Sequence, residues 1–335
     1  MPKKTTLADV AERAGVSPST VSRIINGTAR VTQQTRQTVQ EAIVALSYQP
    51  NVSAKGLVQG KTLTVGVVTH DLGCPYFGPA LQGLQEALQG TEYMPIFLDA
   101  HWDKHLEERA IQRLLGRVDG LMVMGGLLGE TRLQQIARQI PLIALGRSIP
   151  EFEHQCVQVD QYHSTRQLMD HLFSLGHQRI VHISGPQGHV DGQERLRAYQ
   201  DAMLNEGLNA DPDWVYTGDF QEATGLKAVQ HWHEQHVQYT ALFAANDQMA
   251  LGARLALHEL GIQVPHQVSL VGFDDTVAAA FAVPPLTTIR QPMHELGRRA
   301  GRALLQLMEG REVRLARVMP ELMVRASTGP VPKAP

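Results

Sequence analysis

LADVAERAGVSPSTVSRIING, residues 7–27, determines the architecture of the N-terminal part of the chain. Apolar residues recur in it at helical spacing as far as Ala14, and Gly15 then supplies the left-handed conformation that ends a helix. Ser17 is a good N-cap, and Pro18 occupies the first position of a second helix, where its missing N–H costs nothing. The stretch therefore predicts two short helices joined by a glycine turn, which is the helix-turn-helix arrangement.

A third helix completes the predicted unit. Val21, Ile24 and Ile25 form the apolar stripe of the second helix. The third helix is predicted from about Gln33 to Leu46, with Val39, Ile43 and Leu46 facing inward. Three short helices with these stripes predict a compact all-α head.

In such a head the second helix enters the major groove of DNA, where base edges present a readable pattern of donors and acceptors. The side chains that would face the groove are Pro18, Ser19, Ser22 and Arg23. Arg23 alone among them has a fork that matches guanine bidentately. The hydroxyls of Ser17, Thr20 and Ser22 suit phosphates, which position a protein without specifying sequence. The alternative is an ordinary helical hairpin with a solvated polar face.

The charge of the chain is unevenly distributed. Residues 1–61 contain eight lysines and arginines against three acids, a net charge of +5, so the rest carries −8 and the whole chain −3. Because phosphate neutralisation supplies most of the sequence-independent affinity for nucleic acid, a basic head on an acidic body indicates that only the head binds a polyanion. Charge alone does not distinguish this from a chance cluster.

The composition is that of an ordinary globular protein, with 335 residues, 43% of them hydrophobic and 19% charged, enough for two or three domains. No run approaches the roughly 18 apolar residues of a membrane span, and the first ten residues lack the apolar core of a secretory signal. Cys74 and Cys156 are too far apart for a CxxC site. We therefore expect a cytoplasmic protein that has no contact with a membrane.

SYQPNVSAKGLVQGK, residues 47–61, follows the third predicted helix. Pro50 interrupts helix continuation and Asn51 can cap a new helix, but one of only about two turns, too short to persist alone in water. Gly56 weakens it by about 1 kcal/mol relative to alanine. We predict a linker that becomes helical only when bound, with Leu57 wedged between base pairs in the minor groove.

The chain as a whole resembles the LacI/GalR (lactose-repressor/galactose-repressor) family of bacterial transcription factors. The resemblance rests on motifs that follow one another along the sequence: LADVAERAGVSPSTVSRIING, YQPN followed by AKGL, GHQRIVHISG, RLRAY, AANDQMALGA, VSLVGFDDT, PPLTTIRQP and ELMVRAST. Two features depart from the family. Gly56 stands where many members carry a side chain able to touch DNA, and the C-terminal TGPVPKAP lacks the leucine heptads of tetrameric members.

The resemblance implies a fold and residue roles. The fold is an N-terminal all-α helix-turn-helix head plus an α/β two-lobed core with parallel sheets, like that of periplasmic binding proteins. The expected parts are a DNA-binding domain (1–49), a hinge helix and linker (50–61), and an effector-binding and dimerisation core (62–335), with lobe 1 at about 62–160 and 291–321 and lobe 2 at about 161–290 and 322–330. The residues expected at DNA are Thr6, Leu7, Ser17, Pro18, Ser19, Thr20, Ser22, Arg23, Asn26, Thr32, Tyr48, Asn51, Ala54, Lys55 and Leu57.

Independently of the family, short β-branched runs alternate with helical patterns from residue 62 onward. The runs predicted to be buried strands are 63–69, 95–100, 120–126, 142–146, 179–184, 241–247 and 268–273. Most precede helices such as 166–175, and this alternation indicates parallel sheets covered on both faces. Ligands of such sheets bind at the carboxyl ends of strands. Polar groups and glycines gather there: Asp71, Gly125, Gly126, Arg147, Asn246, Asp247, Asp274 and Asp275.

An enzyme is the alternative from another class, since the two carboxylates of GFDDT (272–276) could act as general acid and base. However, GGLLGE (125–130) fits neither phosphate-binding glycine motif, and the sequence contains no nucleophile elbow. The histidines of HWHEQH (231–236), and His101 with His105 at helical spacing, are expected on solvated faces rather than at a metal. We therefore expect neither catalysis nor a cofactor.

The polar residues at the carboxyl ends of the predicted strands suit a polyhydroxylated ligand. Carboxylates and amides can each bond adjacent hydroxyl groups, and an aromatic ring can cover the apolar face of a sugar. Matched to the family motifs, Arg195, Phe220, Asn246 and Asp274 are expected to bind the effector. Asp71, Tyr76 and Phe77 are expected to close the pocket from the other lobe, and the expected set also includes Arg147, Asp191 and Gln291. Core packing stays open for Phe77 and Phe220, and a capping or ion-pair role for Asp274. Purine-binding relatives tend to lack an asparagine like Asn246, which favours a sugar or sugar phosphate over a nucleobase.

The expected function is regulation of transcription, as a repressor of carbohydrate-metabolism genes. An effector between the lobes would shift the populations of two interlobe geometries and so the affinity for a near-palindromic double-stranded operator. The expected partners are operator DNA, the effector and a second copy of the chain. Three alternatives stay open: a nucleobase or other metabolite as corepressor, a sugar-binding transport receptor, and a DNA-binding protein whose core senses nothing.

Overall fold

The computed structural model describes residues 5–25, 27–48, 60–208 and 211–332. The chain divides into two compact units, Met1–Thr62 and Leu63–Pro335. Among the described residues, no helix combines the length and the apolar character needed to cross a membrane.

Three helices form the first unit: α1 (Leu7–Ala14), α2 (Pro18–Ile25) and α3 (Gln33–Ala45). Val10, Val21 and Val39, one from each helix, are fully buried at its centre. Ile25, Ile43 and Leu46 pack around this core and are partly buried. The predicted helix-turn-helix and its third helix are confirmed.

Local side-chain chemistry sets the helix ends in this unit. Thr6 and Asp9 cap α1 reciprocally, with the Thr6 N–H donating to the Asp9 carboxylate at 2.7 Å and the Asp9 N–H donating to the Thr6 hydroxyl at 3.3 Å. Gly15 ends α1 in the left-handed conformation, with φ of 67°. The Ser17 hydroxyl accepts from the Thr20 N–H at 3.2 Å at the start of α2, as the sequence predicts.

The second unit begins with a five-stranded parallel sheet of order β2-β1-β3-β4-β5. Its strands are β1 (Thr64–Thr69), β2 (Met94–Asp99), β3 (Gly120–Met124), β4 (Leu142–Leu145) and β5 (Cys156–Val157). The helices between them are α5 (Gly78–Leu88), α6 (Lys104–Leu114), α7 (Glu130–Ala137) and the short η1 (Glu153–Gln155). We call the part built around this sheet lobe 1.

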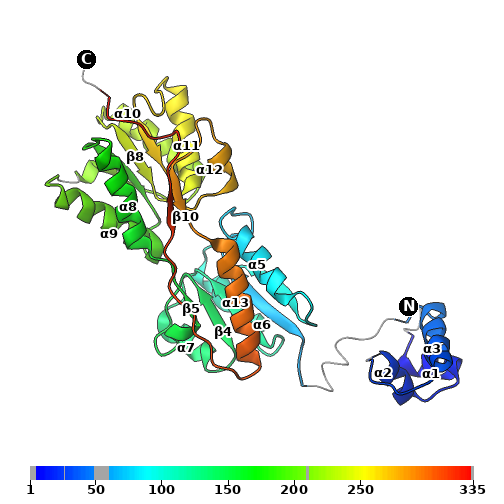
Figure 1. Cartoon of the computed structure of the whole chain (residues 1–335). Helices are drawn as coiled ribbons and strands as arrows, with labels where there is room; N and C mark the ends of the chain where they lie inside the picture. The colour runs from blue at the N-terminus through cyan, green and yellow to red at the C-terminus, as the bar shows by residue number, and fades with distance from the viewer. Residues whose placement is uncertain (1–4, 26, 49–59, 209–210, 333–335) are drawn as a thin grey trace. The chain divides into compact units, whose positions relative to one another are not determined.

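A four-stranded parallel sheet of order β7-β6-β8-β9 follows. Its strands are β6 (Ile180–Ser184), β7 (Val215–Thr217), β8 (Ala241–Ala244) and β9 (Ser269–Val271). Its helices are α8 (Gln161–Ser174), α9 (Val190–Asn205), η2 (Pro212–Trp214), α10 (Glu222–Glu234), α11 (Asp247–Glu259) and α12 (Val277–Phe281). We call this part lobe 2. The predicted parallel sheets are therefore confirmed, and strands of both sheets are covered by helices (Figure 1).

The chain then passes back to lobe 1 and returns to lobe 2. After β10 (Thr288–Arg290) it forms α13 (Met293–Met308), and it comes back through β11 (Glu321–Met323), which pairs antiparallel with β10. Figure 1 shows α13 beside α5, although more than 200 residues separate them in the sequence. Met293, Leu296 and Leu304 of α13 are buried in the core of lobe 1.

Paired glycines allow the helices to touch in both lobes. A Cβ on Gly83 of α5 would overlap the carbonyl oxygen of His294, and one on Gly297 of α13 would overlap that of Ala80. The same arrangement joins α10 and α11 in lobe 2, through Gly225 and Gly252. The backbones of these helix pairs are therefore in direct contact.

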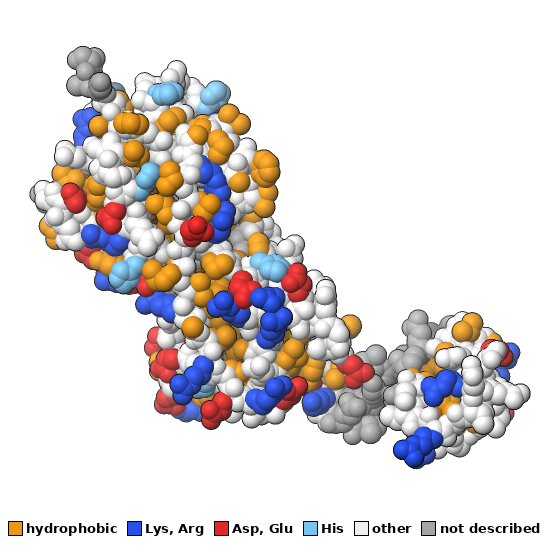
Figure 2. All heavy atoms as spheres, viewed as in Figure 1, with side chains coloured by type: hydrophobic (Ala, Val, Ile, Leu, Met, Phe, Trp, Pro, Cys, Tyr) orange, Lys and Arg blue, Asp and Glu red, His pale blue; other side chains and the backbone are white. Residues whose placement is uncertain are grey.

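The outward face of α13 is charged. Glu295 pairs with Arg298 and Arg299 on the same helix, and His294 lies 3.0 Å from Glu86 of α5. Figure 2 shows side chains of both signs gathered over this part of lobe 1. α13 is therefore amphipathic, with its apolar side in the core and its charged side in solvent.

Candidate functional site: helical head and interlobe cleft

The first turn of α2 presents hydroxyl groups to solvent. Ser17 and Ser19 are exposed, and the Ser17 Oγ lies 2.9 Å from the Ser19 Oγ and 2.8 Å from the Thr20 Oγ1. Because the N-terminus of a helix carries partial positive charge and unbonded amides, these hydroxyls stand where a phosphate oxygen would bind.

Arg23 is exposed one and a half turns further along α2, as are Pro18 and Ser19 at its start, whereas Ser22 is half-buried. The structure therefore places the guanidinium on a solvent-facing side of the helix, from which it could reach a base edge. Val21 and Ile24 take the opposite face into the core.

The other predicted DNA-facing residues of the first unit have additional structural roles. Thr6 and Thr32 are exposed but cap α1 and α3, and Leu7 and Tyr48 are half-buried against the three-helix core. Asn26, Asn51, Ala54, Lys55 and Leu57, together with Gly56 and the predicted hinge helix, lie outside the described residues.

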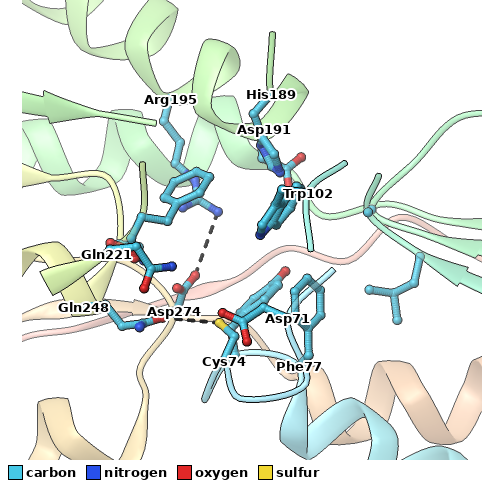
Figure 3. Close-up of a pocket in the computed structure, with 16 residues that line it drawn as sticks. Asp71, Cys74, Phe77, Trp102, His189, Asp191, Arg195, Gln221, Gln248 and Asp274 are labelled. Atoms are coloured by element: carbon cyan, nitrogen blue, oxygen red, sulfur yellow. Dashed lines mark hydrogen bonds and ion pairs between the residues drawn. The ribbon is translucent and has the colours of Figure 1, made fainter. Parts of the chain in front are cut away.

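A cavity with about 600 Å³ of space, part of it open to solvent, lies between the two lobes of the second unit (Figure 3). Its lining comes from segments that follow the strands of both sheets. Lobe 1 contributes Asp71, Cys74, Tyr76, Phe77, Trp102, Gly125, Leu145 and Gly146. Lobe 2 contributes His189, Asp191, Arg195, Phe220, Gln221, Asn246, Gln248 and Asp274. The cleft therefore stands at the carboxyl ends of the parallel strands, where open α/β sheets bind ligands.

Eight of the ten residues predicted to bind an effector line this cavity, and Arg147 and Gln291 do not. The Arg147 guanidinium donates instead to the carbonyl oxygens of Gly126 and Leu128, in a neighbouring cavity. Gln291 lies behind the lining, where its amide nitrogen donates to Asp274 at 2.8 Å and its oxygen accepts from the Tyr76 hydroxyl at 3.2 Å. In this geometry the side chains of these two residues are turned toward protein partners and do not line the cavity, so their contact with an effector stays a prediction.

Arg195 and Asp274 face each other in the cleft, with the Arg195 Nη2 3.9 Å from the Asp274 Oδ1 and both side chains less than a tenth exposed. The guanidinium also donates to Gln161 at 3.0 Å and to the Ala245 carbonyl, and it lies 3.8 Å above the centre of the Phe273 ring. Figure 3 shows the two side chains pointing toward each other, joined by a dashed line. Arg195 is thus held on three sides before any ligand enters.

Burial dominates the acid–base properties of the cleft. It raises the pKa of Asp274 to about 8, with the Arg195 charge opposing and the Asp247 charge reinforcing the shift. It also raises the pKa of Asp191, against the opposing charges of Arg195 and Arg147. Both carboxyl groups therefore hold protons more tightly than they would in water.

Aromatic rings form a continuous series across the cleft. Trp102 of lobe 1 stacks on the buried His70 with centroids 4.8 Å apart and meets His189 of lobe 2 edge to face at 5.0 Å. His189 in turn meets Phe220 edge to face at 5.0 Å. These rings supply the apolar surface on which a sugar face or another flat group could lie.

The tautomer of His189 follows from its role as the N-cap of α9. Its Nδ1 accepts from the Gly192 N–H at 3.4 Å, and burial, then the charges of Arg195, Arg147 and His70, lower its pKa to about 3. The ring is therefore neutral near pH 7, and its proton is on Nε2, available as a donor.

Asn246 combines two roles. Its side-chain oxygen caps α11 by accepting from the Met249 N–H at 3.0 Å, and its amide nitrogen donates to the Phe220 carbonyl at 2.9 Å. One N–H and one lone pair remain for a ligand. Asn246 therefore holds the Phe220 segment in place as well as lining the cavity.

Two interlobe contacts involve groups that the sequence did not single out. The Cys74 thiol, whose pKa burial raises to about 11, lies 3.2 Å from the Gln248 side-chain oxygen and donates to it. The Gln248 amide in turn donates to Glu222 at 3.1 Å. Cys74 and Gln248 therefore connect lobe 1 to lobe 2 at the edge of the cavity (Figure 3).

The other lining residues that sequence reasoning missed are Trp102, Leu145, Gly146, His189 and Gln221. Each follows or ends a predicted strand or lies beside a motif, so position along the chain was the available signal. Three lining residues other than glycine have positive φ: Trp102 at 54°, Phe220 at 68° and Asp274 at 117°. Such backbone strain concentrates at binding sites, where it aims side chains into a cavity.

Among the described residues, no group of three or more histidine, cysteine or acidic side chains could hold a metal ion. His231, His233 and His236 are exposed, as predicted. His101, with φ of 47°, precedes α6 and so does not share a helix face with His105, contrary to the spacing argument.

Two family models match different parts of the chain. Residues 6–51 match the family "Bacterial regulatory proteins, lacI family" and residues 169–328 match the "Periplasmic binding protein-like domain". The chain is 32% identical to the HTH-type transcriptional regulator GalR of Escherichia coli (strain K12), over 91% of this chain and 90% of that protein. It is 31% identical to the HTH-type transcriptional repressor CytR of the same strain, over 98% and 97%.

A solved structure described as the lac repressor dimer bound to operator and the anti-inducer ONPF aligns with a TM-score of 0.87 at 29% identity, covering 98% of this chain and all of that one. The predicted fold class is thereby confirmed. The chain belongs to the lacI family of bacterial regulatory proteins, and it is a DNA-binding transcriptional regulator rather than an enzyme.

Proposed function

We propose that this regulator represses genes of carbohydrate metabolism and that a small sugar-type effector, bound in the interlobe cleft, controls its affinity for operator DNA. The carrying observation is the composition of the cleft, in which carboxyl, amide and guanidinium groups from lobe 2 converge with aromatic rings from both lobes. Hydroxyl groups need such paired donors and acceptors, and the apolar face of a sugar ring needs the aromatic surface.

The proposed mechanism is a shift between two interlobe geometries. Trp102–His189 and Cys74–Gln248 join the lobes directly, so a ligand between them interacts with both sides at once. The effector changes DNA affinity only by the difference in its own affinity for the two geometries. In this proposal residues 1–49 read DNA, residues 50–61 form a hinge ordered only on the operator, and the two lobes of residues 62–335 transmit the change.

We further propose that the protein works as a cytoplasmic homodimer on a near-palindromic operator. Exposed apolar side chains on lobe 2, namely Leu255, Val277, Phe281 and Val283, offer a face for a second copy. Two-fold symmetry in the protein would then match two-fold symmetry in the DNA.

The test begins with an operator selected from a random duplex library by the wild-type protein. Operator affinity is then measured by fluorescence anisotropy with and without each member of a panel of sugars and sugar phosphates that has first been screened by thermal shift. We expect at least one member to raise the melting temperature and to change operator affinity by tenfold or more, with little change on a random duplex.

Asp274→Ala should bind the operator normally and lose the response, because it removes a lining carboxyl group without touching the first unit. Asp170→Asn, an exposed change on α8, is the matched control and should respond like wild type. If Asp274→Ala responds normally, the cleft is not the effector site. A response to nucleobases instead of sugars would establish the corepressor alternative, and no response to any compound would favour a core that senses nothing.

A further inference from the structure

The cleft presents carboxylate acceptors to its ligand, and one of them has no protein donor. Asp71 and Asp191 line it from opposite lobes. The Asp71 Oδ1 accepts from the Gly73 N–H at 2.8 Å, whereas no described residue donates a hydrogen bond to the Asp191 carboxylate. The Asp191 Oδ2 instead faces Gly146, 4.0 Å from where a Cβ on that glycine would stand. A ligand rich in hydroxyl groups would supply the missing donors, whereas a phosphate dianion has none to give.

Arg195 is the one lysine or arginine among the described residues that line the cavity, and its hydrogen-bonding capacity is largely used. It donates to Gln161 and Ala245, stacks on Phe273 and faces Asp274 at 3.9 Å. Binding a phosphate bidentately needs two free N–H groups on one edge of the fork. Here Nε and Nη1 both donate to the protein, and the remaining nitrogen, Nη2, faces the Asp274 carboxyl group.

Two helix N-termini of lobe 2 at the cleft, a kind of site that commonly binds phosphate in α/β folds, are already capped by side chains. α9 is capped by His189 and carries Asp191 in its first turn, and α11 is capped by Asn246 and carries Asp247 there. Both of these helices therefore already carry a carboxyl group of the chain in their first turn.

The acid–base properties point the same way. The pKa values of Asp191 and Asp274 are raised chiefly by burial, so this environment already disfavours negative charge. A second anion brought into the same space would meet the same obstacle.

We propose that the cleft selects an uncharged, polyhydroxylated effector and rejects its phosphate ester. This inference rests on the proposed function only in taking the cleft as the effector site. The selecting groups are Asp71 and Asp191, which accept from ligand hydroxyls, and Arg195, which stays committed to the protein.

The first experiment compares matched pairs on the full-length protein by isothermal titration calorimetry: D-glucose with glucose 6-phosphate, D-galactose with galactose 1-phosphate, D-ribose with ribose 5-phosphate, and adenosine with AMP. In every pair that binds, we expect the uncharged member to bind at least tenfold more tightly. A phosphate ester that binds as tightly as its parent overturns the proposal.

Asp191→Asn replaces an ionisable carboxyl group by an amide of the same size, so it should reduce the preference for the uncharged member of each pair by at least tenfold. Asp170→Asn makes the same chemical change on an exposed part of α8 and should leave the preference as in wild type. If both variants, or neither, change the preference, Asp191 does not select against phosphate.

The second experiment needs no knowledge of the effector and uses inorganic phosphate as the probe, followed by 31P line width. In wild type we expect no saturable phosphate binding below about 10 mM, the range of weak surface sites. The Asp71→Asn/Asp191→Asn double variant should gain saturable phosphate binding, and adding Arg195→Ala should remove it again. Saturable binding to wild type that Arg195→Ala removes overturns the inference, as does the absence of any gain in the double variant. If no sugar or nucleoside binds at all, the carbohydrate effector is wrong, while this second experiment still decides for or against exclusion of phosphate.

Discussion

The indole ring of Trp102 in lobe 1 and the imidazole ring of His189 in lobe 2 meet edge to face, with their centroids 5.0 Å apart. Both rings line the cavity, and Trp102 is held from behind by stacking on His70 at 4.8 Å. Because the two rings belong to different lobes, any change in lobe separation alters the surroundings of the indole.

Tryptophan emission should therefore report binding in the cleft. We expect the emission of the wild-type protein to shift on titration with an effector, and Trp102→Phe to abolish the shift because Trp214 and Trp232 do not line the cavity. Trp214 is partly buried against the core of lobe 2, so Trp214→Phe is the control and should retain the emission shift. An unchanged response in Trp102→Phe would contradict the assignment.

The Arg195–Asp274 pair should be coupled more strongly at high pH. Since the pKa of Asp274 is raised to about 8, its carboxylate predominates only above that pH, and the ionic attraction to Arg195 grows as it forms. A double-mutant cycle with Arg195→Ala and Asp274→Asn, measured by denaturant unfolding, should give a coupling energy of about 1–2 kcal/mol at pH 9 and less at pH 6.5. Equal coupling at both pH values would show that the ionisation of Asp274 does not change between pH 6.5 and 9.

Stability should fall as pH rises from 6.5 to 8. The pKa values of Asp274 and Asp247 are raised to about 8 and about 7, chiefly by burial, so the folded chain keeps protons that the unfolded chain has lost. The loss is of the order of 1 kcal/mol per pH unit for each group while it stays protonated in the folded state.

Below pH 6.5 three buried histidines act in the opposite direction. The pKa of His70 is lowered to about 4 and those of His182 and His189 to about 3, so the unfolded chain binds more protons there and stability rises with pH. The maximum should therefore lie near pH 6.5. Unfolding free energies measured across pH 5–9 test this. In Asp274→Asn the free energy of unfolding should fall less steeply above pH 6.5. A fall as steep as in wild type would show that groups other than Asp274 cause it.

Arg23→Ala should weaken operator binding by about 1–3 kcal/mol and relax the preference at one base pair in each half-site, because a bidentate contact to guanine is lost. Arg13→Ala removes an exposed charge from α1 and should leave base preference unchanged. Selection from random duplexes with each variant tests this. A loss of equal size on random and selected DNA would make Arg23 a phosphate contact.

Strongly patterned segments were predictable from the sequence. Helices α1 and α2 begin and end at the residues that their caps indicate, and buried runs such as 120–126 coincide with strands such as β3. The missed strands β5, β7, β10 and β11 have two or three residues each, too few to show a periodicity. Their pairing is set by the rest of the fold.

The sequence predicted which strand ends contribute residues to the cleft, but not the direction in which each side chain points. Arg147 directly follows Gly146, a lining residue, yet its guanidinium turns toward Gly126 and Leu128. Trp102 enters the cavity from a turn with φ of 54°, and His189 meets it only because the lobes close on each other. Such features depend on tertiary geometry rather than on local sequence.

The position of α13 in the chain has a consequence for biosynthesis. Met293, Leu296 and Leu304 complete the core of lobe 1, whose strands begin at Thr64. During translation, that core stays open until roughly the last tenth of the chain is being made, whereas every strand of the lobe 2 sheet is made earlier. Lobe 2 is thus free to assemble on the ribosome before the core of lobe 1 closes. This reverses the usual order, in which the N-terminal domain folds first.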